Sequence, residues 1–320
     1  MEKEKKVKDV DFADSAVPSS ARKNVVTMFM IMLGFTFFSA SMWVGQQLAD
    51  GLDFWGFLGS LILGGIILGI YTGLLGYVGA KTGLSLDLLS QRAFGEKGSY
   101  LPSAMTSFTQ IGWFSVGSFV SGGTATPNFA RFAKDGKAGA ITTVVAFFIG
   151  NSLMFFFGAV SSIFVGGNDI FEVMVRLNLF YLAVLVLGLN IWTTNDNALY
   201  TAGLGLANIF HQRKKPMVLL SGIIGTVASV WLYYNFCGWL NILNCTLPPV
   251  GMILVLAYFM NKEDFEADQP KLKTVDWFAV AGVILGAIVA NLLHWGIASI
   301  NGMVVAAVCY CAGQAVNKRK

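Results

Sequence analysis

The chain has 320 residues, of which 55% are hydrophobic and 12% are charged, and its formal net charge is +4. Its mean hydropathy is +0.64, and average proteins carry about 25% charged residues, so the composition excludes a soluble globular domain. The net charge gives no reason to expect a nucleic-acid partner, because in a membrane protein the placement of charges matters more than their sum. The polar, charged N-terminus has no early apolar region, so we expect no secretory signal peptide.

Seven uncharged stretches predict about nine hydrophobic segments, since the two longest can each hold two spans. In chain order they are residues 24–49, 54–80, 100–130, 138–168, 177–210 (interrupted only by Asp196), 216–261 and 277–317. The two long stretches should bend near residues 234–238 and 294–300. We therefore expect an all-α polytopic membrane protein, with one transmembrane domain at residues 24–316 between cytoplasmic tails at residues 1–23 and 317–320.

Lysine and arginine gather in six zones, which the positive-inside rule assigns to the cytoplasm. The zones are Arg22 with Lys23, and residues 81–97, 131–137, 213–215, 262–273 and 318–320. The chain should cross the membrane twice between consecutive zones, and only the stretch at residues 100–130 breaks this rule. We favour a re-entrant segment there, bent at its glycines and at Pro127. The alternative is a single crossing, which sets the spans downstream of it against the charge bias.

Polar side chains gather inside the span at residues 177–210, in the run NIWTTNDN. Asn190, Thr193, Thr194 and Asn197 follow helical i, i+3, i+4, i+7 spacing and share one face, which should turn away from lipid. Their oxygen atoms suit an alkali cation better than a soft metal. A neighbouring helix unwound near Gly34 would add backbone carbonyls. Asp196, the only acid in a span, either pairs within the bundle or takes part in cation coupling.

The stretch at residues 100–130 offers groups that suit a small planar heteroaromatic ligand. Gln110 can donate and accept hydrogen bonds, and Trp113 and Phe119 present flat ring faces. Ser118 and Ser121 add hydroxyls or exposed backbone. Aromatic pairs in membrane segments also serve simply for packing or as interface anchors, so the spacing alone leaves both readings open.

Enzyme chemistry is not expected. The sequence has no HExxH motif, no nucleophile elbow and no cluster of acids with a base. Its four cysteines lie in apolar stretches without metal-binding spacing, so they are expected to be buried free thiols.

Seven segments carry a resemblance to a known family: VPSSARK, MLGFTFFSASMWVG, LGYVGAKTGLSLDLLSQRAFGEKGS, TQIGWF, SFVSGGTATPNFARF, FFIGNSLMFFFGA and LGLNIWTTNDNALYTAGLG. They resemble the cytosine permease branch of the nucleobase:cation symporter (purine-cytosine permease) family, from about Val17 to the C-terminal spans. The resemblance implies a five-plus-five inverted-repeat bundle of the leucine-transporter type with two extra helices. It also implies a protein of the plasma (inner) membrane that imports cytosine or a related nucleobase with a cation, Na⁺ being expected.

The resemblance also implies a site, residue by residue. Cytosine would stack between Trp113 and Phe119, with its edge bound by Gln110, Asn190 and the backbone around Ser118 and Ser121. Na⁺ would bind the carbonyls of Gly34, Phe37 and Asn190 and the hydroxyls of Thr193 and Thr194. No cofactor is expected apart from this coupling ion, and the remaining partner is the lipid bilayer.

One departure from the family is large. Members usually carry twelve spans, whereas here TQIGWFSVG runs directly into SFVSGGTAT, segments that belong to the family's third and sixth helices. Roughly 90 residues, three to four spans at about 20 residues each, are missing at a seam near residues 116–118. The inverted-repeat bundle is therefore incomplete. The alternative function is a shortened, transport-incompetent homologue that acts only as a binding or structural membrane protein.

Overall fold

The computed structural model describes residues 12–37, 39–116, 122–167, 169–267, 269–293 and 295–317. These residues form helices, apart from connections and one isolated bridge between Lys23 and Ala133. A short 3-10 helix, η1 (Ser19–Ala21), precedes fourteen α-helices: α1 (Val25–Thr36), α2 (Ala40–Gly51), α3 (Phe54–Thr82), α4 (Leu86–Phe94), α5 (Tyr100–Val116), α6 (Gly122–Ala130), α7 (Gly136–Val165), α8 (Ile170–Arg176), α9 (Phe180–Phe210), α10 (Lys214–Tyr234), α11 (Phe236–Met260), α12 (Lys262–Glu266), α13 (Trp277–Leu292) and α14 (Ala298–Asn317). The expected all-α class is confirmed.

The helices follow the uncharged stretches closely. Five helices among the described residues are long and apolar enough to cross a membrane, namely α3, α7, α10, α11 and α14, and the bent pair α1–α2 would make a sixth. The predicted bend at residues 234–238 is the junction of α10 and α11 at Asn235. The bend predicted at residues 294–300 separates α13 from α14.

Polar residues in the short connections start the long helices. Asp53 accepts a hydrogen bond from Gly56 N at the start of α3, and Asp135 accepts one from Ala138 N at the start of α7. Asp276 does the same for α13. Each carboxylate satisfies a backbone N–H that has no partner within its helix. The few acidic residues in these turns therefore serve as N-terminal caps of the long helices.

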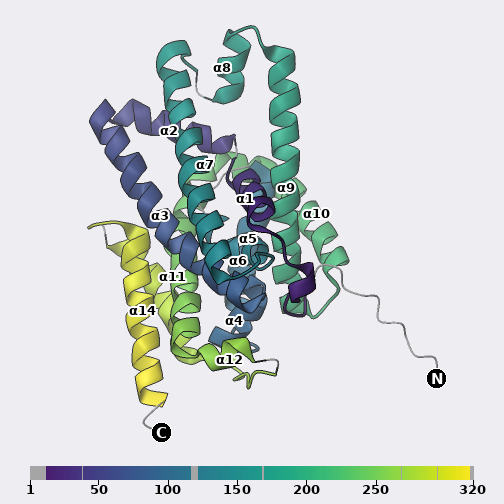
Figure 1. Ribbon diagram of the computed structural model, residues 1–320. Coiled ribbons are helices and arrows are strands. Elements are labelled where there is room, and N and C mark those ends of the chain that lie inside the picture. The colour runs from purple at the N-terminus through teal and green to yellow at the C-terminus, as the bar shows by residue number, and fades with distance from the viewer. Residues whose placement is uncertain are drawn as a thin grey trace, which may run out of the picture.

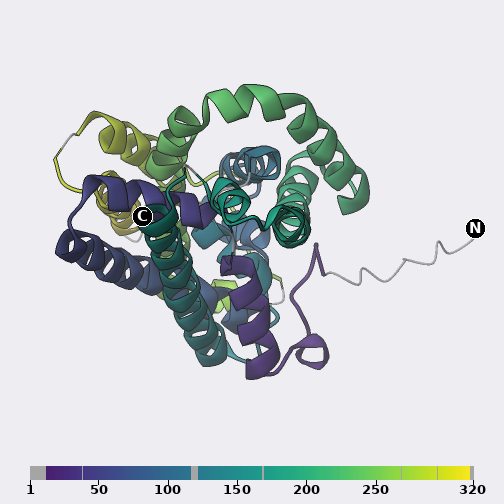
Figure 2. The ribbon, with the colours of Figure 1, turned by 90° about the horizontal axis from the view of Figure 1, so that it is seen from above.

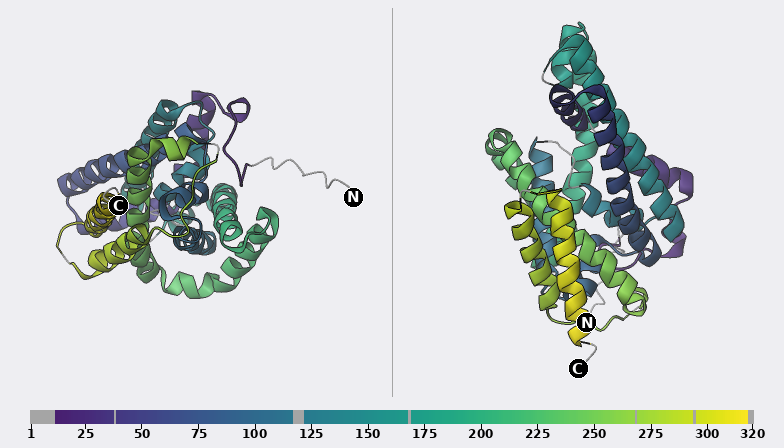
Figure 3. Two further views of the ribbon diagram at one scale, coloured as in Figure 1. Left: turned by 90° about the horizontal axis from the view of Figure 1, so that it is seen from below. Right: turned by 90° about the vertical axis from the view of Figure 1, so that its left-hand side faces the viewer.

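Glycines let the long helices approach one another closely. A Cβ added at Gly76 of α3 would lie 2.6 Å from Thr143 Oγ1 of α7, and one at Gly286 of α13 would lie 2.6 Å from Gly302 O of α14. Such contacts between small residues are the usual way for membrane helices to pack. Figure 3 shows α13 and α14 side by side at the edge of the bundle, and Figure 2 shows α5 inside the arc of α10 and α11.

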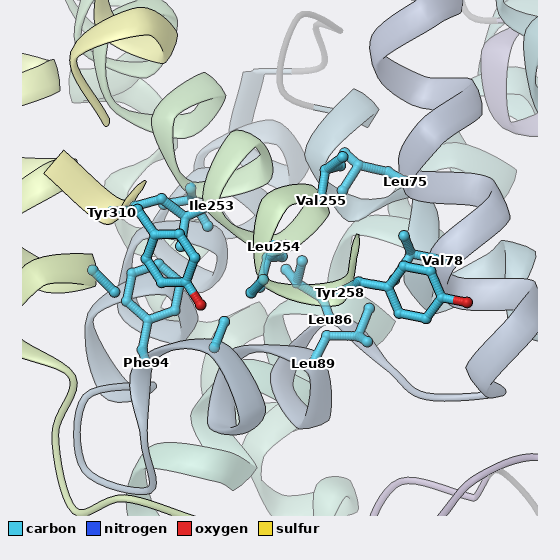
Figure 4. Close-up of a cluster of buried hydrophobic side chains, with 14 of the residues drawn as sticks. Leu75, Val78, Leu86, Leu89, Phe94, Ile253, Leu254, Val255, Tyr258 and Tyr310 are labelled. Atoms are coloured by element: carbon cyan, nitrogen blue, oxygen red, sulfur yellow. The ribbon is translucent and has the colours of Figure 1, made fainter. Parts of the chain in front are cut away.

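A cluster of buried apolar side chains ties α4 to the long helices. Leu75 and Val78 of α3, Leu86 and Leu89 of α4, and several residues of α11 and α14 meet there without solvent exposure (Figure 4). Burial of this kind stabilises by about 1.5–3 kcal/mol per large side chain. The short helix α4 is thereby fixed at one end of the molecule (Figure 1).

Both ends of the stretch at residues 100–130 lie against α4. Near the start of α5, Ser103 Oγ donates to Asp87 Oδ1. Near the end of α6, Asn128 Oδ1 accepts a hydrogen bond from Leu86 N at 2.7 Å. The stretch thus leaves and returns at the same end of the molecule, as a re-entrant segment would. Its middle, residues 117–121, lies outside the described residues.

Five of the six basic zones lie at this same end, which we call the basic end, and the zone at residues 318–320 lies outside the described residues. Lys23 N donates to Phe132 O at 2.7 Å, which joins the first zone to that at residues 131–137. Glu96 N donates to Lys273 O at 2.8 Å, which joins the zone at residues 81–97 to that at residues 262–273. Tyr100 also bonds His211, which precedes the zone at residues 213–215. The geometry is compatible with one cytoplasmic face, and the membrane topology itself stays a prediction.

Asp87 is a buried carboxyl at the basic end, outside the membrane-spanning helices. It is 5% exposed, and burial raises its pKa to about 6 even though Ser103 and Arg131 act to lower it. Asn208 Nδ2 of α9 donates to Ser103 Oγ at 2.8 Å, which links α4 to α5 and α9. Because the pKa of Asp87 is higher in the folded than in the unfolded state, the contribution of this carboxyl to stability is fully present below a pH of about 4 and is lost as pH rises through about 6.

Thiol labelling should reveal the topology. In a cysteine-free background expressed in intact cells, a membrane-impermeant reagent should label Leu177→Cys, between α8 and α9, but not Lys134→Cys at the basic end. Both positions are exposed in the structure, so only sidedness separates them. Labelling of Lys134→Cys alone would show that the stretch at residues 100–130 crosses once.

Replacing Asp87 should flatten the pH dependence of stability. Between pH 4.5 and 7 the parent protein should lose roughly 2 kcal/mol through this carboxyl, seen as a falling Tm in detergent. Asp87→Asn removes the titration and should largely abolish that fall. The exposed Asp264→Asn is the control and should keep the parent profile. An Asp87→Asn profile that parallels the parent would disprove the assignment.

Candidate substrate and ion site

The first predicted span is broken between α1 and α2, which are bent by 58° relative to each other. The last backbone bond of α1 runs from Phe37 N to Leu33 O at 2.8 Å, and α2 begins at Ala40. Gly34 stays helical, and a Cβ there would meet open space. The expected break exists, but it lies after Phe37 rather than at Gly34.

Asn190 of α9 bonds both sides of this break. Its Oδ1 accepts from Ser39 N at 2.9 Å, and its Nδ2 donates to Phe37 O at 2.9 Å. Backbone groups left unpaired in an apolar setting would cost about 1–3 kcal/mol each. In this conformation the Asn190 amide serves the helix break, so binding a ligand edge would require it to exchange or share partners.

Oxygen atoms of two helices gather around the break. The carbonyls of Gly34 and Phe37 lie in the last turn and at the C-cap of α1, where carbonyls lack helical partners and the helix dipole is negative. One turn after Asn190, Thr194 Oγ1 donates to Asn190 O at 2.5 Å. The side chain of Thr193 lies outside what the structure describes. The arrangement offers hard oxygen ligands to a cation.

Gln110 and Trp113 are buried one turn apart on α5. The Trp113 ring meets Trp239 of α11 edge to face, with ring centroids 4.6 Å apart. Trp239 also fills the space beside Gly112, where a Cβ would lie 2.2 Å from the indole ring. Sequence reasoning missed Trp239, because it stands in an uncharged stretch with no neighbouring motif.

The other predicted ligand contacts, Ser118, Phe119 and Ser121, lie outside the described residues. The proposed stacking of a ligand between Trp113 and Phe119 therefore stays a prediction. The two described halves of the site are on helices that pack against each other, α5 and α9. Trp113 and Ala198 of α9 belong to one buried cluster. That cluster lies two turns from Asn190 along α9.

Arg131 was counted in the sequence only as a basic loop residue, yet it is fully buried. Its Nη2 donates to the Tyr200 hydroxyl of α9 at 2.7 Å, and its Nη1 donates to Phe12 O at 2.8 Å. The signal available in the sequence was the apolar run FARFA around it. Asp196, in contrast, is exposed on α9.

Comparison with known families gives a match over nearly the whole chain. The family described as "Permease for cytosine/purines, uracil, thiamine, allantoin" matches residues 16–126 and 115–314. The cytosine permeases of Escherichia coli strain K12 and of E. coli O157:H7 are each 37% identical over 405 aligned positions, covering 98% of this chain and 96% of theirs. Against 320 residues, 405 positions leave at least 85 without a counterpart. The shortfall fits a deletion at the seam, where the two family matches overlap.

Two solved structures share the fold. One is Mhp1, a nucleobase-cation-symport-1 family transporter, in a closed conformation with bromovinylhydantoin bound; it has a TM-score of 0.76 at 15% identity and covers 95% of this chain and 94% of its own. The other is the inward-facing conformation of Mhp1, with the same TM-score and identity, covering 95% and 93%. These matches confirm the leucine-transporter type of fold, and the relatives are permeases rather than enzymes. The chain is a multi-pass membrane protein that belongs to the family of permeases for cytosine and purines, uracil, thiamine and allantoin.

Proposed function

We propose that the chain is a cation-coupled symporter that imports cytosine or a related nucleobase by alternating access, with Na⁺ as the coupling ion. The observation that carries the proposal is the broken helix α1–α2 held by Asn190, with Thr194 one turn away. Broken helices at mid-membrane present carbonyls and dipole ends to ions and substrates. Because the chain belongs to a permease family, we infer that this break serves transport.

Two features support the proposed substrate: the side chains of α5 and the ligands named for the relatives. Gln110 can both donate to and accept from the edge of a heterocycle, and Trp113 offers an aromatic face one turn away. The curated relatives are named cytosine permeases, and a structural neighbour is described with bromovinylhydantoin bound. A small planar ring with hydrogen-bonding edges is the chemistry common to these ligands.

The proposed ion site uses the oxygen atoms around the break. A carbonyl has two lone pairs, so Phe37 O could bind Na⁺ while it still accepts from Asn190. The carbonyls of Gly34 and Asn190 and the hydroxyls of Thr193 and Thr194 would complete the ligand set. Oxygen-only ligation suits Na⁺, and the negative end of the α1 dipole favours it.

We also propose the plasma membrane as the location, with the N-terminus in the cytoplasm. The basis is the positive-inside rule applied to the basic end. Arg22 and Lys23 lie there beside the zone that begins at residue 131.

A second candidate function is supported by the exposed part of α9. Tyr181 is 86% exposed and Trp192 is 65% exposed, and Asp196 is exposed as well. At least 85 positions of the relatives have no counterpart here, so helices that could cover this part are absent. A chain of this kind could bind the ligand without transporting it, as a binding or structural membrane protein.

Uptake of labelled cytosine separates the two candidates. In cells that lack their own permease, expression of the chain should raise uptake above the empty-vector background, and an inward Na⁺ gradient should increase it further. Uptake at background, with the protein present in the membrane, would reject the transporter and favour the binding protein.

Thr194→Ala tests the ion site. Loss of one hydroxyl ligand should remove most of the Na⁺ dependence of uptake while leaving some Na⁺-independent uptake. Thr226→Ala of α10 is a matched control, because that hydroxyl also bonds the carbonyl four residues earlier, at 2.8 Å. A Thr194→Ala protein with parental Na⁺ dependence would refute the assignment of Thr194.

A further inference from the structure

Eight of the described helices form two groups that pack within themselves. In the first group α7 packs against α1, α2, α3 and α6, and in the second group α5, α9 and α10 pack against one another. Over the described residues the two groups touch each other directly at few points. The helices α4, α8 and α11 contact both groups, and a few individual side chains cross directly from one group to the other.

Arg131 crosses between the groups at the basic end. It follows the last residue of α6, in the first group, and donates to the Tyr200 hydroxyl of α9, in the second, at 2.7 Å. The ring of Phe129 lies 6.1 Å from that of Tyr200. A buried guanidinium is costly unless its donors are bonded, so this hydrogen bond is not an incidental surface contact.

The N-terminal segment closes over the same point. Phe12 O accepts from Arg131 Nη1 at 2.8 Å, and Lys23 N donates to Phe132 O at 2.7 Å. Arg22 Nη1 donates to Ala80 O of α3 at 2.6 Å. These bonds fix the end of α6 to the first group. The bond to Tyr200 is then the one that Arg131 must break if the second group moves away.

We propose that the Arg131–Tyr200 hydrogen bond is an inner latch, a positioning contact that holds α6 against α9 at the basic end. The two hydrogen bonds of Asn190 to Phe37 and Ser39, here called the Asn190 bridge, join the same two groups. Asn190 lies about 15 Å from Tyr200 along α9. Transporters of this type work by moving one set of helices against another. A latch at one end with a separate bridge farther along would let the basic end open while the helix break stays paired. The role of this motion in transport rests on the proposed function, whereas the latch itself does not.

The test measures how often the latch opens. Leu204 lies one turn after Tyr200 on the same side of α9 and is 3% exposed. A thiol at Leu204→Cys should react with a maleimide only when the groups separate, at a rate proportional to the open fraction. Cys245 of α11, which is 2% exposed, is retained to report general loosening, and the other three cysteines are replaced. Peptide mass spectrometry resolves the two thiols.

Tyr200→Phe keeps the ring, including its contact with Lys214, and removes only the hydroxyl. Loss of a hydrogen bond to a charged group should raise the labelling rate of Leu204→Cys about tenfold, with Cys245 unchanged. Tyr71→Phe is the matched control, because it removes a hydroxyl that bonds Thr124 of α6 at 2.7 Å within the first group. Its rate should stay within about twofold of the parent.

Two results would overturn the latch: equal labelling rates in Tyr200→Phe and Tyr71→Phe, or a parallel rise at Cys245. The labelling uses neither cytosine nor Na⁺. A chain that fails the uptake assay can still show the latch, and a chain that transports can still lack it.

Discussion

The two hydrogen bonds from Asn190 to the break between α1 and α2 are the interaction on which the rest of the site depends. A helix that stops inside a membrane leaves backbone groups without partners, and hydrocarbon cannot supply them. Asn190 provides both a donor and an acceptor at that point. With the break satisfied, the Phe37 carbonyl at the end of α1 faces α9, where Thr194 adds a hydroxyl one turn after Asn190.

The helices are joined to one another in two different ways. Glycine contacts hold α3 to α7 and α13 to α14 over long distances, whereas side chains such as Asn190 and Arg131 join the two helix groups at particular points. Close packing gives rigid units, and isolated polar bridges allow those units to move. Both bridges are present in this chain, although at least 85 positions of its relatives have no counterpart in it.

Much of the fold could be predicted from uncharged stretches alone, because membrane length fixes helix length. The residues of α3 and α7 and the bend at Asn235 follow directly, and counting the basic zones singled out the stretch at residues 100–130. The position of the first break could not be predicted in this way. Glycine permits a break at Gly34, but the break lies after Phe37, where Asn190 bonds Phe37 O and Ser39 N.

The site was only partly predictable for the same reason. Asn190 and Thr194 stood out because polar groups are costly in a span. Arg131 did not, since the positive-inside rule treats every arginine near a span as a solvated residue, and its burial depends on Tyr200 and Phe12. Trp239 carries no polar signal at all, and only the tertiary fold places it on Gly112 and Trp113.

We propose that the broken helix and α9 form an ion site coupled to a nucleobase site. Equilibrium binding of labelled cytosine to the purified chain in lipid nanodiscs, titrated with Na⁺ at constant ionic strength, tests it most directly. Saturable binding whose affinity rises with Na⁺ is expected, because two positively coupled sites strengthen each other reciprocally. Saturable binding with the same affinity in choline and in Na⁺, or no saturable binding, would contradict it.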